Sequence, residues 1–202
     1  MRLIRSTDYR RMPWKNGGGE TAEIAVWPSG AALDAFVWRL SIARVNGDGP
    51  FSSFAGIDRT LAILDGDGLR LSIEGRPIAE LTRTSSPYAF PADVATSAVL
   101  LGGPVVDLNI MTRRGRVAHR MWRESAEVSV AVHVRTLATL IVCASGRAGV
   151  TSSAGEAELG PQDTLLLGQT DPTTRIAAAG GATLLLVEIL AQTGAGSSPN
   201  PT

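Results

Sequence analysis

Three stretches of alternating polar and apolar residues carry the side chains that are best suited to bind or transform a small molecule. Successive side chains of a β-strand point to opposite faces, so every second residue shares a face. Guanidinium, hydroxyl and amide groups donate hydrogen bonds to carboxylates and carbonyls, and acidic side chains could orient these donors. The polar stripes are Thr21 with Glu23, Arg39 with Ser41, and Asp107 with Asn109 and Met111.

These stripes have two interpretations. If they line the interior of a β-barrel, they form a polar pocket for a small molecule. If they face outward, they are the solvated surface of a sandwich whose strands alternate between core and solvent. The sequence leaves both interpretations open.

A further cation, Lys15, is the single lysine beside 18 arginines. It lies in the run Met-Pro-Trp-Lys-Asn-Gly-Gly-Gly at 12–19. The glycines could let backbone amides approach an anion, or they could simply form a tight turn. The run lacks the spacing of a nucleotide phosphate loop.

The residues that usually hold metals or act as nucleophiles are sparse. His119 and His133 are far apart in the sequence and belong to no His-x-His pair, so we expect no metal site. Cys143 lies in the apolar run 140–144, where a thiol has a raised pKa and packs as a small hydrophobe. The sequence has no Gly-x-Ser-x-Gly motif. We therefore expect neither a metal nor another cofactor.

The overall charge argues against several classes of partner. The 202 residues include 19 basic and 19 acidic side chains, and the pI is about 6.7. Binding to nucleic acids or to a membrane surface normally needs a broad positive field, so neither partner is expected. One cysteine, with no apolar leader or spanning run, predicts a soluble cytoplasmic protein without internal disulfides.

Short runs of strand-forming residues recur throughout the chain and are separated by turns rich in Gly, Pro and Asp, which predicts an all-β fold. A strand, a glycine turn, a Pro-x-Asp-like turn and another strand occur once in each half. This repeat predicts a bicupin, with two cupin-like β-barrel or jelly-roll halves in one chain. The expected strands are 21–26, 36–43, 60–64, 69–73, 97–101, 106–111, 128–134, 139–144, 164–167 and 183–189.

The expected division of the chain follows from the same pattern. We expect an N-terminal half at 1–115 that carries the pocket and a C-terminal half at 116–192, with the boundary in the polar stretch 115–127. The last residues, 193–202, have the composition of a disordered tail.

Four motifs occur in an order that matches a known family. They are 12–19 followed by Thr21 and Glu23, Trp-Arg-Leu-Ser-Ile-Ala at 38–43, 48–56 followed by Asp58 and Arg59, and Asp-Leu-Asn-Ile-Met-Thr-Arg-Arg-Gly at 107–115. With these motifs the chain resembles the HutD/Ves family over about residues 5–190. The resemblance implies a bicupin without a recognised metal site that binds a small ligand and modulates histidine utilisation. It suggests N-formylglutamate or urocanate as the ligand.

The resemblance also implies which residues form the site. The segment 14–16 would border the pocket, 50–54 would form its rim, and Asp58 and Arg59 would pair as a structural support. The second half has no comparable motif and would act as a scaffold or in a homodimer. The expected ligand-binding residues are Trp14, Lys15, Asn16, Glu23, Arg39, Ser41, Pro50, Phe51, Ser52, Asn109 and Met111.

Three functional hypotheses follow. The favoured one is a binding protein, not an enzyme, in which Arg39 and Lys15 hold a small carboxylate metabolite without a metal. The second is a metal-independent isomerase or hydrolase for a histidine-pathway intermediate, with Glu23 or Asp107 as general base and Arg39 stabilising negative charge. The third is a structural or interaction protein whose barrel is filled by side chains.

Overall fold

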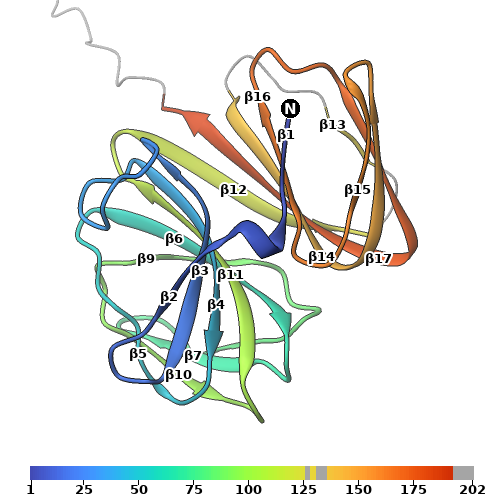
Figure 1. Cartoon of the computed structure of the whole chain (residues 1–202). Helices are drawn as coiled ribbons and strands as arrows, with labels where there is room; N and C mark the ends of the chain where they lie inside the picture. Colours follow the sequence, from blue (N-terminus) through green and yellow to red (C-terminus); the bar gives the residue numbers. More distant parts are fainter. Residues whose placement is uncertain (126–127, 131–135, 193–202) are drawn as a thin grey trace, which may run out of the picture.

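The computed structural model describes residues 1–125, 128–130 and 136–192 (Figure 1). The protein is all-β, as predicted, and its strands are joined by turns and one short 3-10 helix, η1 (Ser6–Asp8). His133 and the tail expected at 193–202 lie outside the described residues. Within the described ranges, no helix has the length and apolar character needed to pass through a bilayer.

The first two sheets are built from residues 10–113, and every strand pairing in them is antiparallel. The six-stranded sheet has the order β2 (Arg10–Pro13), β3 (Gly19–Trp27), β4 (Trp38–Val45), β11 (Val105–Arg113), β6 (Ile57–Asp65) and β9 (Tyr88–Pro91). The four-stranded sheet has the order β5 (Gly49–Pro50), β10 (Thr96–Leu100), β7 (Leu69–Ile73) and β8 (Ala79–Leu81).

The third sheet is formed almost entirely by the second half of the chain. Its order is β1 (Arg2–Ile4), β16 (Thr164–Gly168), β14 (Thr136–Ser152), β17 (Thr174–Ala191) and β12 (Val117–Glu124). In addition, β13 (Val128–Val130) pairs with β17, and β15 (Gly155–Leu159) pairs with β14. The long strands β14 and β17 bend where their register shifts, so the sheet curves around its own core (Figure 1).

The six-stranded sheet is covered on both faces, so most of the polar side chains on its central strands β4 and β11 are buried. One face, with Leu40, Ile42 and Leu108, packs against Leu185 and Val187 of β17 in a core shared by the two halves. The other face packs against the four-stranded sheet, and we call the space between these two sheets the N-terminal interior. Every residue of β4 except Arg44 is therefore buried.

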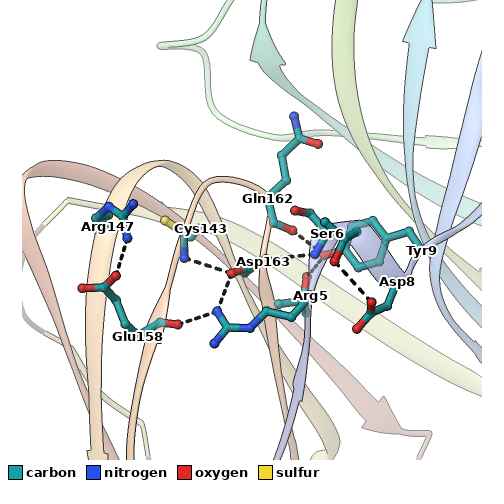
Figure 2. Close-up of polar contacts among 12 residues, drawn as sticks. Arg5, Ser6, Asp8, Tyr9, Cys143, Arg147, Glu158, Gln162 and Asp163 are labelled. Carbon is teal, nitrogen blue, oxygen red and sulfur yellow. Dashed lines mark hydrogen bonds and ion pairs between the residues drawn. The ribbon is translucent and has the colours of Figure 1, made fainter.

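The first residues, which we call the N-terminal strap (residues 2–13), belong to both parts of the fold. Strand β1 pairs with β16 of the third sheet, and after η1 the chain enters the six-stranded sheet as β2. Figure 2 shows how the strap is held: Arg5 lies 2.7 Å from the Asp163 carboxylate, which also accepts a hydrogen bond from the Ser6 amide at 2.8 Å. The Tyr9 hydroxyl bonds the Gln162 carbonyl and, at 2.8 Å, the Thr164 hydroxyl.

Strands β12 and β1 of the third sheet are not among those expected from the sequence. The expected boundary at 115–127 contains strand β12. Its polar residues fit a strand because they find partners across the fold: Arg120 pairs with Glu188, and Arg123 donates to the carbonyls of Ser85 and Ile63. Strand β1 comes from the start of the chain but pairs with β16 in the sheet that is otherwise built from the second half.

Candidate functional site

The polar stripes lie on the face of the six-stranded sheet that points into the N-terminal interior. Register places Met111 beside both Arg39 and Arg59, and Asn109 beside Ser41, on adjacent strands. The four polar side chains are almost completely buried, with Arg39 5%, Ser41 3%, Arg59 7% and Asn109 2% exposed. The interpretation of these stripes as a solvated outer face is therefore wrong, because the outward direction on these strands is already occupied by apolar side chains.

Hydrogen bonds organise the interior into two groups. In the first, Arg39 Nε lies 2.7 Å from the Glu23 carboxylate, and Arg39 Nη1 approaches the Ser41 hydroxyl at 3.5 Å. In the second, Arg59 donates from Nε to Asn109 Oδ1 at 2.7 Å. Asn109 Nδ2 in turn donates to Asp107 Oδ1, so Asn109 links a buried cation to a buried anion.

The two groups form a balanced set of charges in a region of low polarity. Burial lowers the pKa of Arg59 to about 10, with Asp107 acting against this shift and Arg39 adding to it, so the guanidinium stays protonated at neutral pH. Burial raises the pKa of Asp107 to about 6, although Arg59 and the hydrogen bond from Asn109 oppose the increase. Asp107 is thus an acid that titrates close to neutrality.

Several polar atoms in this interior keep unused hydrogen-bonding capacity. Asp107 Oδ2 is buried and has no hydrogen-bond partner in the described part of the chain. Within the same described residues, Arg39 Nη2 and Arg59 Nη1 donate to no protein atom. The two guanidinium nitrogens can donate to the acceptors of an anion, whereas Asp107 Oδ2 is itself an acceptor and can be satisfied only by a donor or a proton.

Aromatic residues close the interior beside Arg59. The ring centroid of Phe51 lies 4.4 Å from Arg59 Cζ, and that of Phe90 lies at 5.6 Å. Phe54, on the same loop as Phe51, packs edge to face with Phe36 at a centroid distance of 6.4 Å. The rim expected at 50–54 therefore does contact the polar group, through the Phe51 ring.

The expected pair of Asp58 and Arg59 does not form. The two residues are neighbours on β6 and point to opposite faces. Asp58 Oδ1 accepts hydrogen bonds from Arg114 at 2.9 and 3.0 Å, and Arg114 also reaches Asp93 at 3.1 Å. Asp93 accepts from the Gly56 amide as well, so Arg114 and its two acids fasten the loop that carries Phe51 and Phe54.

The segment 14–16 lies away from Arg39. The β2–β3 turn ends at Gly19, which pairs with Val45, six residues along β4 from Arg39 and hence about 20 Å away at ~3.3 Å per residue. The segment forms a tight turn in which the Asn16 side chain accepts from the Gly18 amide and Lys15 is exposed. Trp14 is partly buried, packs on the apolar core of the N-terminal interior and bonds Thr21 at 2.8 Å.

The remaining expected residues have mixed positions. Met111 is buried between the two arginines, whereas Pro50 and Ser52 are exposed. Pro50 and Phe51 help to line an open recess of about 510 Å³ beside β7 and β10. A second recess, of about 310 Å³, is lined by residues of β6, β9, β11 and β12 and includes Arg59 and His119.

His119 and Cys143 occupy structural positions. The ring nitrogens of His119 bond the hydroxyls of Thr60 and Thr112 at 2.7 and 2.6 Å, and burial lowers the pKa of His119 to about 4. Burial raises the pKa of the Cys143 thiol to about 11, as predicted for an apolar run. In the described ranges no cluster of three or more His, Cys, Asp or Glu side chains is arranged to hold a metal ion.

Sequence reasoning placed Arg59 in a structural pair with Asp58 and left Asp107 out of the ligand-binding set. A signal for Arg59 was present, because alternation along β6 puts it on the same face as Leu61 and Ile63, an apolar and therefore inward face. The missing information was the pairing of β11 between β4 and β6, which brings Arg59 beside Asn109.

The family assignment agrees with this arrangement. The HutD family model matches residues 6–186, which include all strands of the polar interior. The chain belongs to the HutD family. The Pseudomonas putida 21.2 kDa protein of the hutC 3′ region is 45% identical over 121 residues, and the match covers 60% of this chain and 63% of that relative. Protein Ves of Citrobacter koseri is 41% identical over 114 residues, covering 54% of this chain and 58% of Ves.

Solved structures extend this likeness over nearly the full chain. HutD from Pseudomonas fluorescens SBW25 is 30% identical with a TM-score of 0.81, covering 95% of this chain and 99% of that one. A conserved protein of unknown function from Pseudomonas aeruginosa PAO1 is 33% identical with a TM-score of 0.84, covering 94% and 98%. Bacillus subtilis oxalate decarboxylase, at 10% identity and a TM-score of 0.64 over 95% of this chain and 77% of that one, shares the fold alone, which is cupin-like. The names of the HutD relatives associate the family with the histidine utilisation locus.

Proposed function

We propose that this HutD-family protein binds a small carboxylate metabolite in the N-terminal interior and thereby modulates histidine utilisation. Arg39 and Arg59 would hold the carboxylate, Ser41 and Asn109 would complete its hydrogen bonds, and the Phe51 ring would cover it. In this proposal Arg59, and not Lys15, is the second cation that holds the carboxylate. N-formylglutamate and urocanate are the candidate ligands, and no metal takes part in this proposal.

The observation that carries the proposal is the contrast between the two interiors. In the N-terminal interior two arginine residues are at least 93% buried, and each keeps one terminal nitrogen that donates to no atom in the described protein. The core enclosed by the third sheet is mainly apolar, built from residues such as Ile141, Leu165 and Leu184. It also holds one buried hydroxyl without a hydrogen-bond partner in the described residues, that of Thr139. Burying charged groups is unfavourable even when they are paired, and the free donors of these two cations support the binding of an anion.

The overall organisation is part of the same proposal. The three sheets would correspond to two cupin-like halves, of which the first binds the ligand and the second supports it through the shared core. We further propose a soluble cytoplasmic protein that acts on a metabolite and on neither nucleic acid nor membrane. Its exposed edge strands would support a homodimer, which size-exclusion chromatography with light scattering can test.

The test is ligand binding by thermal shift and calorimetry. Purified protein would be titrated with N-formylglutamate, urocanate, formiminoglutamate, histidine, glutamate and unrelated carboxylates. A ligand that binds only the folded state raises the melting temperature in a concentration-dependent way. Arg39→Ala and Arg59→Ala should each weaken binding by about 1.5–3 kcal/mol, the contribution of a charge-assisted hydrogen bond.

A matched control is available on the same strand. Arg44 is exposed on β4 and bonds Asn46 outside the interior, so Arg44→Ala should leave the affinity unchanged. Failure of every carboxylate to bind would refute the proposal and favour the third hypothesis, a structural or interaction protein. Equal losses of affinity in Arg39→Ala and Arg44→Ala would show that the ligand does not bind at Arg39.

A metal-independent enzyme is the alternative function, and one observation favours it. The pKa of Asp107, raised to about 6 by burial, is in the range that suits a general base near neutral pH. An isomerase or hydrolase would turn over a histidine-pathway intermediate and lose activity in Asp107→Asn with binding retained. Binding without turnover of any intermediate would reject the enzyme.

A further inference from the structure

We propose that binding of an anion between Arg39 and Arg59 is accompanied by the uptake of one proton from solvent onto Asp107. This inference rests on the proposed function and adds to it a regulation of the same site by pH. Its basis is the position of a buried carboxylate behind the two arginines and the balance of charge in the interior.

The Asp107 carboxylate is placed to accept a proton. It is completely buried, and it lies four residues from Met111 on β11, whereas the arginines flank Met111 itself. Oδ1 accepts from Asn109, and Oδ2 has no partner in the described part of the chain. Among the residues that the structure describes, no hydrogen bond joins Asp107 directly to a cation; its link to Arg59 passes through the Asn109 amide.

The groups that face this interior can be counted strand by strand. Glu23 comes from β3, Arg39 from β4, Arg59 from β6 and Asp107 from β11, and Tyr88 of β9 lies at the edge. The four-stranded sheet contributes apolar side chains such as Leu71 and Ala98. With Asp107 ionised, these two cations and two anions of the described part of the chain cancel.

An incoming carboxylate disturbs this balance. It adds one negative charge to a region where charges interact strongly because water is excluded. Glu23 is already paired with Arg39 at 2.7 Å, whereas Oδ2 of Asp107 has no hydrogen-bond partner in the described part of the chain. A proton on Oδ2 restores neutrality, and the pKa of Asp107, near 6 without ligand, rises further when the anion is bound.

The consequence is a specific dependence of affinity on pH. Linkage predicts that the association constant falls by about tenfold per pH unit above about pH 6, and that it is flat at lower pH while the ligand stays ionised. The slope ends where the pH exceeds the raised pKa of Asp107 in the complex.

Calorimetry can measure the proton directly. Wild-type protein would be titrated at pH 7 with acetate and with N-formylglutamate, of which one of the two carboxylates would enter the interior. The carboxyl groups of both compounds have pKa values well below 6 and so do not titrate in this range. Repeating each titration in buffers with different ionisation enthalpies gives the number of protons taken up. We expect close to one proton at pH 7 and a tenfold loss of affinity between pH 6.5 and 7.5.

Two variants complete the experiment. Asp107→Asn mimics the protonated acid, so its affinity should be independent of pH between 6 and 8 with no proton uptake. Glu80→Gln makes the same chemical change on an exposed residue of the four-stranded sheet and should behave as wild type. If Asp107→Asn does not fold, the proton count of the wild type still decides.

The outcomes separate the two proposals. Binding to the wild type with no proton uptake and no slope overturns the proton linkage and leaves the proposed function in place. Proton uptake that persists in a folded Asp107→Asn overturns the assignment to Asp107. Absence of binding by both probes from pH 6 to 8, in wild type and in Asp107→Asn, overturns the proposed function and this inference together.

Discussion

The ring of Phe51 lies against the buried guanidinium of Arg59, with 4.4 Å between the ring centroid and Cζ. Phe51 comes from the loop that joins the four-stranded sheet to the six-stranded sheet, and Arg59 from the strand that follows it. A cation held over an aromatic face is stabilised by the ring quadrupole and keeps its orientation. The loop and the charged interior are therefore one physical unit.

Replacing Phe51 by Ala should loosen this unit. The cation–π contact and its cover from water would be lost, which should lower the free energy of unfolding by about 0.5–2 kcal/mol beyond the loss of apolar contact. Urea unfolding measures this change, and Phe51→Leu is the control, because it keeps apolar volume and removes the ring. Equal stability of the Leu variant and the wild type would show that the ring quadrupole contributes nothing.

The link made by Asn109 predicts a larger effect. Asn109→Ala removes the acceptor of Arg59 and the donor of Asp107 together and leaves two buried charged groups without their partner. Each orphaned group costs about 1–3 kcal/mol, so the variant should be among the least stable single substitutions in the first half. Met111→Leu, a change of similar volume on the same face, should cost less than ~1.5 kcal/mol. Comparable denaturation midpoints for the two variants would contradict the role of the amide.

The N-terminal strap should respond to acid through Asp163. Burial by itself raises the pKa of Asp163, but hydrogen bonds from Ser6, Arg5 and Gly160 outweigh it, so the pKa lies below its ordinary value (Figure 2). A carboxyl whose pKa is lower in the folded state contributes stability above its unfolded pKa, near 4, and loses it as the pH falls through the folded value. We expect the urea midpoint to fall between pH 5 and pH 3, and to fall less in Asp163→Asn.

The control for this prediction is Glu156→Gln, an exposed carboxyl of the same sheet. It should keep the acid dependence of the wild type. An unchanged pH profile in Asp163→Asn would show that other carboxyl groups cause the acid loss.

The bend in β14 depends on Gly146. This residue has φ of +75°, and a Cβ added to it would lie 2.8 Å from Cα of Ala182. Gly146→Ala should therefore destabilise the protein by about 1–3 kcal/mol, because it combines a strained backbone with an overlap. Gly149→Ala on the same strand meets no atom within 4 Å and should be neutral or stabilising by up to ~1 kcal/mol. Thermal denaturation of both variants tests the difference, and similar melting temperatures would refute it.

The sequence by itself determined the fold class and the faces shared by residues on several strands. Alternation placed Arg39 with Ser41 and Asp107 with Asn109, and the observed strands β4 and β11 contain these groupings. Turn residues separated the strands and predicted the all-β class, and the four motifs identified the HutD family, which the family model confirms. The apolar run around Cys143 predicted an unreactive, buried thiol.

Tertiary structure decided what covers each face. The alternation of side chains along a strand shows which residues share a face, but it does not show which face is turned toward the interior. On β4, Leu40 lies on one face and Arg39 on the other. Because β17 packs against Leu40, Arg39 points into the N-terminal interior. The same long-range pairing set Arg59 beside Asn109 and left Lys15 on a distant turn. Contacts between residues far apart in the chain have no local signature. The sequence therefore shows which arginines and lysines are present, but not which of them lie at the site.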